Sequence, residues 1–335
     1  MGGLQTAAVI DVHAHAVLAE TMGAAGPYGP TIGGDAAKPW FRIGDYRLDG
    51  VRYVGSPFMD VDLRLRRMAA ASIDYQLLSP NPLTYFHFIE EAAAVAFCRT
   101  HNDALSALVG AHPDHLGGLA ALPIQSPAAA AEELGRGVRN LGLLGGYIGT
   151  DTRHALHDEA MDVLYETAVD LDVPLFVHPA PAGIDGPPGD PNLKRFDLDV
   201  VIGFAAQETI AVATLIYGGV LDRHPALDLC LSHGGGATAF LLGRMAKAAR
   251  KRPWSPDYLR ADGAFEERFA RLWLDTHVAS EASLALLTSI VGDKRLVYGT
   301  NFAGWDAPDA DGHERPEPKF ADNARRLLRV GRVRA

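Results

Sequence analysis

The feature that most constrains this fold is a regular alternation of short apolar runs with longer amphipathic stretches. Eight runs have the length and composition of buried strands: Ala7–Val12, Tyr75–Ser79, Leu116–Leu122, Gly145–Gly149, Val173–His178, Leu227–His233, Leu272–His277 and Arg295–Asn301. Between them lie stretches with helical spacing: Asp60–Ala71, Glu90–Leu108, Pro127–Asn140, His157–Leu171, Glu208–Arg223, Thr238–Arg250 and Glu281–Val291. Strands that alternate with helices pair in parallel, and eight such units predict an α/β fold of the (β/α)8 TIM-barrel type. The alternative is an open doubly wound sheet, which is disfavoured because no Gly-x-Gly-x-x-Gly follows an early strand.

Two irregular segments interrupt this alternation. Residues 18–57, rich in Gly and Pro, follow the first strand, and Pro179–Asn192 follows the fifth. Insertions after barrel strands lie at the C-terminal face, where active sites of this fold form. No stretch has the composition of a linker, so we expect one domain spanning residues 1–335, with 18–57 as an insertion over the active-site face.

Charge and cysteine content limit the partners and the compartment. The formal net charge is −10, which argues against a nucleic acid or an anionic membrane as partner. Both cysteines, Cys98 and Cys230, lie in apolar runs and are expected to be buried, reduced thiols. We find neither a signal peptide nor an uninterrupted apolar run of about 18 residues. A cytoplasmic enzyme acting on a small molecule is the expectation.

Histidines stand at the ends of several predicted strands. His13 and His15 are two residues apart on the first strand and therefore point to the same side. His178 ends the fifth strand, and His233 ends the sixth, just before three glycines. A histidine at one strand end is more often a packed or surface residue than a ligand, but the C-terminal ends of all barrel strands meet on one face. We therefore predict a metal site there. His277, which ends the seventh strand, fits equally a pocket residue or a loop residue.

At these residues the sequence resembles the second amidohydrolase family. The stretches that carry the resemblance are Ile10–His15, Leu119–Pro123 with Gln125, Phe176–Pro179, Glu208–Ile210, Ser232–Gly236, Phe240–Arg244, Tyr298–Thr300 and Asn323–Leu327. They cover nearly the whole chain in order. Members of this family include decarboxylases of aromatic and muconate acids, hydratases and hydrolases, so the resemblance implies the fold more strongly than the reaction.

The resemblance implies a role for each matching residue. His13, His15 and His178 correspond to ligands of one divalent metal, usually zinc, although iron, manganese and cobalt also suit such ligands. His233 corresponds to the proton-transfer group beside a metal-bound water. Arg244 corresponds to an arginine that reaches the pocket of the neighbouring subunit and binds the substrate carboxylate, which implies a homodimer. A second carboxylate-binding arginine is expected in the insertion, with Arg52 the best match and Arg47 the alternative.

The sequence departs from the family pattern at Asn301, where an Asp ligand is expected. A neutral amide is a weaker metal ligand than a carboxylate and cannot act as a general base. Three interpretations follow: Asn301 contacts the metal or its water through the amide oxygen, Asp306 substitutes for the missing carboxylate, or the site binds metal poorly and does different chemistry. We favour the first.

The function expected from these features is metal-dependent, non-oxidative decarboxylation of an aromatic or muconate-type carboxylic acid. His233 and the metal-bound water would handle protons, with Asn301 beside them. Aromatic residues near the pocket suit a planar acid, although each one alone is better explained by packing: Trp40, Phe41, Tyr85, Phe86, Phe88 and Trp305. The alternatives are a hydratase or hydrolase of an unsaturated or lactone acid, a redox-iron oxygenase, and a binding protein without catalysis.

Overall fold

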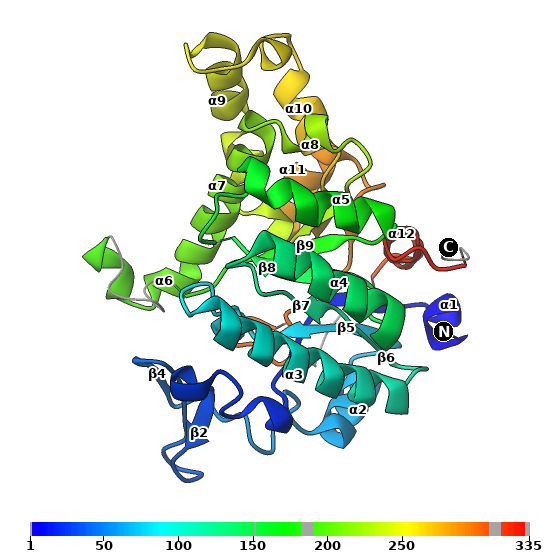
Figure 1. The fold of residues 1–335 in the computed structure, drawn as a ribbon. Helices are drawn as coiled ribbons and strands as arrows, with labels where there is room; N and C mark the ends of the chain where they lie inside the picture. The colour runs from blue at the N-terminus through cyan, green and yellow to red at the C-terminus, as the bar shows by residue number, and fades with distance from the viewer. Residues whose placement is uncertain (1, 151, 182–189, 308–315, 332–335) are drawn as a thin grey trace.

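A ring of parallel strands forms the centre of the computed structural model, which describes residues 2–150, 152–181, 190–307 and 316–331 (Figure 1). The strands are β1 (Ile10–Ala16), β5 (Tyr75–Pro80), β6 (Leu116–Gly118), β7 (Ala120–Ala121), β8 (Gly146–Gly149), β9 (Leu175–His178), β10 (Leu229–Leu231), β11 (Trp273–Asp275) and β12 (Leu296–Val297). One sheet has the order β1-β5-β6 and another the order β12-β11-β10-β9-β8-β7.

Backbone hydrogen bonds join these two sheets into a closed barrel. The amide of Leu119, between β6 and β7, donates to Leu78 at 2.9 Å, so β6 and β7 act as one barrel position. At the other junction the amide of Val12 donates to Tyr298 at 2.9 Å and that of Phe302 to His13 at 3.3 Å. The predicted (β/α)8 barrel is therefore confirmed.

Helices surround the barrel: α2 (Val61–Ala70), α3 (Glu91–Ala111), α4 (Pro127–Leu141), α5 (Asp162–Asp170), α7 (Gly203–Tyr217), α9 (Thr238–Lys251), α11 (Glu281–Val291) and α12 (Pro318–Leu327). Shorter helices are α1 (Gly2–Thr6), α6 (Leu198–Val201), α8 (Val220–Arg223) and α10 (Ala264–Phe269). Local chemistry fixes several ends. The Asp60 side chain accepts the Leu63 amide at the start of α2, and Gly142, with φ of 69°, ends α4 in the left-handed region.

Residues from alternate strand positions fill two apolar layers. Val12, Leu77, Phe176 and Val297 belong to the cluster inside the barrel, together with Cys230. Their chain neighbours pack outward against the helices in a second cluster, which includes Leu78, Leu175, Val177, Leu229, Leu231, Leu274 and Leu296. Cys98 and Cys230 are both buried free thiols, as expected.

The insertion after β1 holds a small antiparallel sheet that the sequence analysis did not foresee. Its strands are β2 (Thr31–Gly33), β3 (Trp40–Ile43) and β4 (Tyr46–Asp49), in the order β2-β3-β4. Phe41 and Ile43 on β3 are fully buried in a separate apolar cluster. The sequence signal for this hairpin was the two-residue turn Gly44-Asp45 between two stretches of alternating apolar and polar residues. Of the second irregular segment, Pro179–Asn192, residues 182–189 lie outside the described part of the chain.

The stretch Leu198–Tyr217 is long and apolar enough, by length and composition alone, to cross a membrane. The sequence analysis did not anticipate this. In the structure the stretch consists of α6 and α7, and the side chain of Glu208 on α7 is fully buried. Glu208 also lies in the middle of α7, although the sequence predicted it to begin a helix. The helix starts at Gly203, and the predicted continuation to Arg223 is broken at Gly218 and Gly219.

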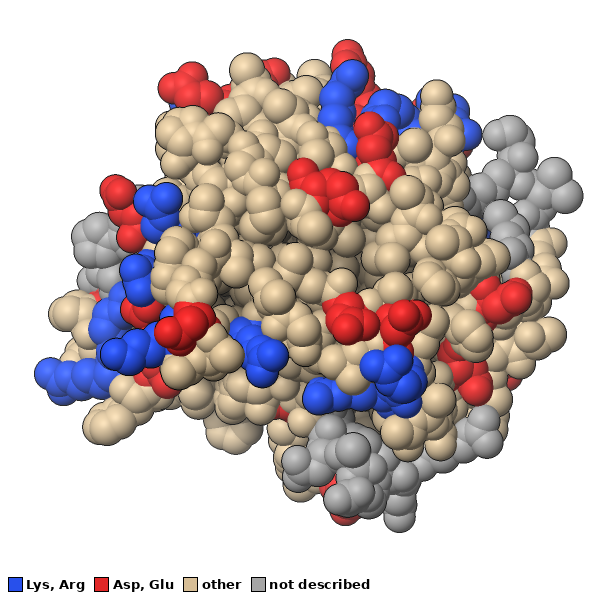
Figure 2. All heavy atoms as spheres, turned by 90° about the horizontal axis from the view of Figure 1, so that it is seen from below, with Lys and Arg blue, Asp and Glu red and all other residues tan. Residues whose placement is uncertain are grey.

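Helices α1 and α12 lie together on one side of the barrel, where Arg325 donates to the Leu4 carbonyl, whereas β4 and α6 lie on the opposite side (Figure 1). Seen from below that view, charged side chains of both signs lie mostly around a largely uncharged centre (Figure 2). No continuous basic patch is visible among the described residues on this face.

Candidate active site

An irregularity in β1 sets the direction of its two histidines. The pairing of β1 with β5 shifts between Asp11 and Ala14. Val12 packs in the interior cluster, yet Ala14 packs in the outer one, so the alternation changes phase between them. His13 and His15 are consequently both buried at the mouth of the barrel, as predicted from their spacing.

The barrel brings His178 to this pair. One ring nitrogen from each of His13, His15 and His178 lies within 4.8 Å of the others, and Nε2 of His13 is 3.1 Å from Nε2 of His178. All three side chains are buried. Burial lowers the pKa of His15 to about 3 and those of His13 and His178 well below their usual value, so the rings are neutral, which is the form that binds metal ions.

Hydrogen-bond partners on the far side of each ring fix the tautomers. Nδ1 of His15 lies 3.0 Å from the carbonyl of Pro80, and Nδ1 of His178 lies 2.6 Å from that of Pro179. A carbonyl only accepts, so each Nδ1 carries the hydrogen. Each Nε2 is then a lone-pair donor, and Nε2 of His15 is a buried atom without a hydrogen-bond partner in the described structure. Lone pairs that converge at 3.1 Å repel each other unless a cation lies between them, so this donor set fits a divalent metal.

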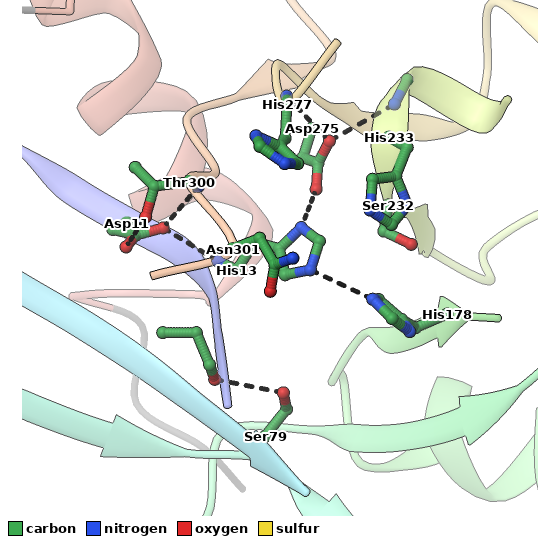
Figure 3. Close-up of polar contacts among 12 residues, drawn as sticks. Asp11, His13, Ser79, His178, Ser232, His233, Asp275, His277, Thr300 and Asn301 are labelled. Atoms are coloured by element: carbon green, nitrogen blue, oxygen red, sulfur yellow. Dashed lines mark hydrogen bonds and ion pairs between the residues drawn. The ribbon is translucent and has the colours of Figure 1, made fainter. Parts of the chain in front are cut away.

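Asp275, at the end of β11, orients the third ring. Its Oδ2 lies 2.7 Å from Nδ1 of His13, and its Oδ1 accepts the amides of His277 at 3.0 Å and Gly234 at 3.3 Å (Figure 3). A carboxylate on the outer nitrogen of a metal-binding histidine fixes the ring and raises its basicity. Asp275 was not predicted as a site residue, although a polar residue at a strand end is the same signal that identified the histidines.

Asp11 holds the strands together below the histidines. Its carboxylate accepts the hydroxyl of Thr300 at 2.7 Å, the backbone amides of Thr300 and His13 at 3.1 Å, and the Gln76 side chain at 2.9 Å. Burial raises the pKa of Asp11 to about 6. This side chain thus connects the first, second and last barrel strands directly under the site.

His233 lies just beyond β10 in a tight turn and pairs with Glu208 of α7. Its Nδ1 lies 2.9 Å from Oε1 of Glu208, which also accepts the Ser232 hydroxyl. Burial alone would lower the pKa of His233, but the Glu208 carboxylate raises it to about 9, so the ring is an imidazolium at neutral pH. The turn needs glycine at Gly236, where φ is 67° and a Cβ would lie 2.1 Å from the Ala205 carbonyl oxygen.

Asn301 and Asp306 lie together beside the cluster. Nδ2 of Asn301 donates to Oδ1 of Asp306 at 2.6 Å, and Nε2 of His277 lies 3.0 Å from Oδ2 of Asp306. His277 is therefore a pocket residue. Ligand atoms of His233, His277 and Asp306 lie within 4.8 Å of one another, as a group separate from the three-histidine cluster.

A cavity of about 560 Å³ opens beside His233, His277 and Asp306. Its other walls are mostly apolar and come from α6, α7, α9, α11 and the residues just before α9 and α11: Val200, Val201, Phe204, Ala205, Ala237, Ala239, Phe240, Val278, Ala279, Leu286 and Leu287. Phe204, which was not predicted, lies 5.8 Å from His178 and 5.9 Å from His233 between ring centroids.

The aromatic residues selected from the sequence divide between this cavity and the packing. Trp305 lines the cavity and is 71% exposed. Tyr85 lies 6.3 Å from His178, between ring centroids. Phe41 and Phe86 are core residues, Phe88 packs against that core, and Trp40 lies under the Arg47 guanidinium.

The predicted substrate-binding arginines lie outside the histidine cluster. Arg47 pairs with Asp49 at 2.8 Å, and Arg52 donates to the Val54 carbonyl at 3.1 Å, both on the exposed insertion. Arg244 is exposed on α9, and this helix lies on the other side of the molecule from β2 and β4 of the insertion (Figure 1). Their roles in binding substrate stay predictions.

Comparison with known proteins decides the family. The amidohydrolase profile matches residues 10–330. This chain belongs to the amidohydrolase family. A 2-amino-3-carboxymuconate-6-semialdehyde decarboxylase from Dictyostelium discoideum is 28% identical over 254 residues, which cover 75% of this chain and 68% of that one. A gamma-resorcylate decarboxylase from Rhodococcus jostii strain RHA1 is 32% identical over 197 residues, covering 55% of this amidohydrolase chain and 59% of the relative.

A solved structure shares the amidohydrolase architecture over almost the full length. The apo form of IDCase from Metarhizium anisopliae superposes with a TM-score of 0.80 at 21% identity, covering 98% of this chain and 99% of that one. At this identity the similarity shows the fold alone.

Proposed function

We propose that this amidohydrolase is a metal-dependent, non-oxidative decarboxylase of an aromatic or muconate-type carboxylic acid. The observation that carries the proposal is a cluster of three buried imidazoles, those of His13, His15 and His178, next to His233, which lines a mostly apolar cavity. The two relatives described above are decarboxylases, which supports the reaction class.

Decarboxylation breaks the bond between the carboxylate and the substrate skeleton and leaves an electron pair on carbon. His233 faces the cavity as an imidazolium and is placed to give that carbon a proton as CO2 departs. Glu208 keeps the ring charged and oriented before the transfer, and solvent returns the proton afterwards. The apolar walls exclude water and thereby favour neutral CO2 over the carboxylate anion.

We propose that His13, His15 and His178 hold one divalent ion, with zinc as the expected metal and Asn301 adjacent to it. When bound, the ion supplies positive charge that polarises substrate oxygens. Three imidazole nitrogens suit zinc, and iron, manganese and cobalt are the alternatives that elemental analysis separates.

We also propose a homodimer in which Arg244 contributes to the neighbouring cavity. Helices α7 and α9 carry exposed apolar side chains, including Ile210 at 65% and Phe240 at 82% exposure, and Phe240 also lines the cavity. Large apolar side chains exposed on a surface are the kind of residue that a protein interface buries. Arg52 and Arg47 of the insertion are the proposed cationic partners for a second substrate carboxylate.

The reaction is tested by incubating purified enzyme with a panel of hydroxybenzoates and muconate-type acids while CO2 and product mass are followed. We expect CO2 release that is lost in His178→Ala and His233→Asn and retained in His157→Asn, an exposed control. A product that keeps every carbon and gains the mass of water would overturn the proposal in favour of a hydratase. Oxygen consumption with stoichiometric iron would favour an oxygenase.

A further inference from the structure

We propose that Asp306 supplies the negative charge that Asn301 lacks. Asp306 does not bind the metal itself; it accepts a hydrogen bond from the Asn301 amide, and the oxygen of that amide faces the ion. This inference rests on the proposed three-histidine metal site. It assigns Asp306 as a positioning residue, with His277 as its second partner.

The backbone after β12 is built to bring Asp306 back to Asn301. Asn301 and Ala303 have φ values of 48° and 66°, both in the left-handed region. The Gly304 amide donates to the Asn301 carbonyl at 2.7 Å, and a Cβ on Gly304 would lie 2.6 Å from Nδ2 of Asn301. Two non-glycine residues in the left-handed region are costly and occur where the surrounding structure holds them. The turn therefore fixes Asp306 against the site.

The two hydrogen bonds to Asp306 determine how the Asn301 amide is used. Oδ1 of Asp306 accepts from the Asn301 NH2 at 2.6 Å, and Oδ2 is 3.0 Å from Nε2 of His277. The amide NH2 is thus committed to a carboxylate, which leaves the amide oxygen as the group available to an ion. The backbone next to Asn301 contacts His13, because the Phe302 amide donates to the His13 carbonyl at 3.3 Å. A carboxylate that accepts from an amide polarises it and makes its oxygen more negative.

Asp306 lies next to both halves of the site. Its Oδ1 accepts from Asn301, and the next residue, Phe302, donates its amide to the His13 carbonyl at 3.3 Å. Its Oδ2 lies 3.0 Å from Nε2 of His277, whose ring centroid is 5.6 Å from that of His13 and 5.5 Å from that of His233. One carboxylate outside the histidine cluster is therefore placed close to the cluster and to His233.

Direct coordination by Asp306 is a different arrangement and predicts a different metal content. The ligand atoms of Asp306, His277 and His233 form their own compact group, separate from His13, His15 and His178. An ion held by Asp306 together with His277 and His233 would therefore be a second ion. Our proposal requires one ion per chain.

The test measures metal affinity by competition with a chromophoric chelator, using zinc and cobalt, for the wild type, D306N and N301D/D306N. In the double variant the carboxylate and the amide exchange places across the same hydrogen bond. We expect D306N to bind about 10- to 100-fold more weakly, the range seen for outer ligands. We expect N301D/D306N to recover affinity to at least the wild-type value, since the carboxylate now adjoins the ion. D49N, on the exposed insertion, is the control.

A purely structural role for Asp306 predicts no recovery in the double variant, because the loop would remain altered. Unchanged affinity in D306N, failed recovery in N301D/D306N, or two ions per wild-type chain would each overturn the inference. Asp306→Ser also removes the charge. If D306N fails to fold, the affinity of Asp306→Ser can be measured in its place. Wild-type protein that binds no ion would instead overturn the proposed metal-dependent function itself.

Discussion

Oε1 of Glu208, in the middle of α7, lies 2.9 Å from Nδ1 of His233, which follows β10. The carboxylate is fully buried, whereas the His233 side chain is 14% exposed and lines the cavity. Burial raises the pKa of Glu208, while its charge raises that of His233 to about 9. His233 therefore carries a proton at neutral pH, and its ring lies at the cavity, where a substrate can contact it.

This pairing predicts a loss of stability at alkaline pH. The folded-state pKa of His233 is above its unfolded value of 6.5, so its stabilisation is complete below about pH 6.5 and is lost as pH rises through about 9. We expect the wild type to lose about 3 kcal/mol of unfolding free energy across this window relative to Glu208→Gln. Urea unfolding at several pH values measures it. Parallel profiles for the two proteins would contradict the assignment.

Asp275→Asn is expected to weaken metal binding without removing a metal ligand. The carboxylate fixes the tautomer of His13, and loss of such an outer partner typically costs about 10- to 100-fold in affinity. Chelator competition checks the value, with Asp49→Asn as the surface control. If Asp275→Asn kept wild-type affinity, the orientation of His13 would have to come from elsewhere.

Arg64 is expected to stabilise the fold under the site. Its buried guanidinium donates to the carbonyls of His15 at 2.5 Å and Pro57 at 2.9 Å and to the Gln76 side chain at 2.8 Å. Arg64→Met leaves these acceptors unsatisfied and should cost about 2–5 kcal/mol. Arg66→Met, on the exposed side of the same helix, is the matched control and should cost less than about 1 kcal/mol. Denaturant unfolding compares them, and equal losses would show that the network contributes little.

The proposed exchange of Arg244 between subunits predicts complementation. His178→Ala and Arg244→Ala should each be nearly inactive alone. Mixed dimers contain one site with both groups intact, so an equal mixture that has exchanged subunits should recover roughly a quarter of wild-type activity. CO2 release measures the recovery. A mixture no more active than its components would place Arg244 within its own subunit or outside the site.

The histidines could be predicted from the sequence because each one stands at the end of a short apolar run, which marks the end of a buried strand. His13, His15, His178 and His233 each follow a short apolar run, and the barrel rule places such ends together. The structure brings these four together as expected, and it shows that His277 belongs to the pocket.

The partners of these histidines were harder to predict because they depend on tertiary contacts. Glu208 meets His233 because α7 packs against the turn that follows β10. Asp306 reaches Asn301 because Asn301 and Ala303 adopt left-handed backbone conformations. No periodic pattern of apolar residues predicts such a turn. The β2–β4 sheet was missed since the Gly and Pro content of the insertion outweighed a short alternating pattern around Gly44.

The hydrogen bonds of Asp11 determine when, during synthesis of the chain, the metal site can form. Its carboxylate reaches Thr300, 289 residues further along the chain, as well as Gln76. When only the first strands have left the ribosome, the Asp11 carboxylate lacks half of its hydrogen-bond donors, because Thr300 has not yet been synthesised. We expect metal loading to be a late event, possible only after the C-terminal strand has left the exit tunnel and closed the ring.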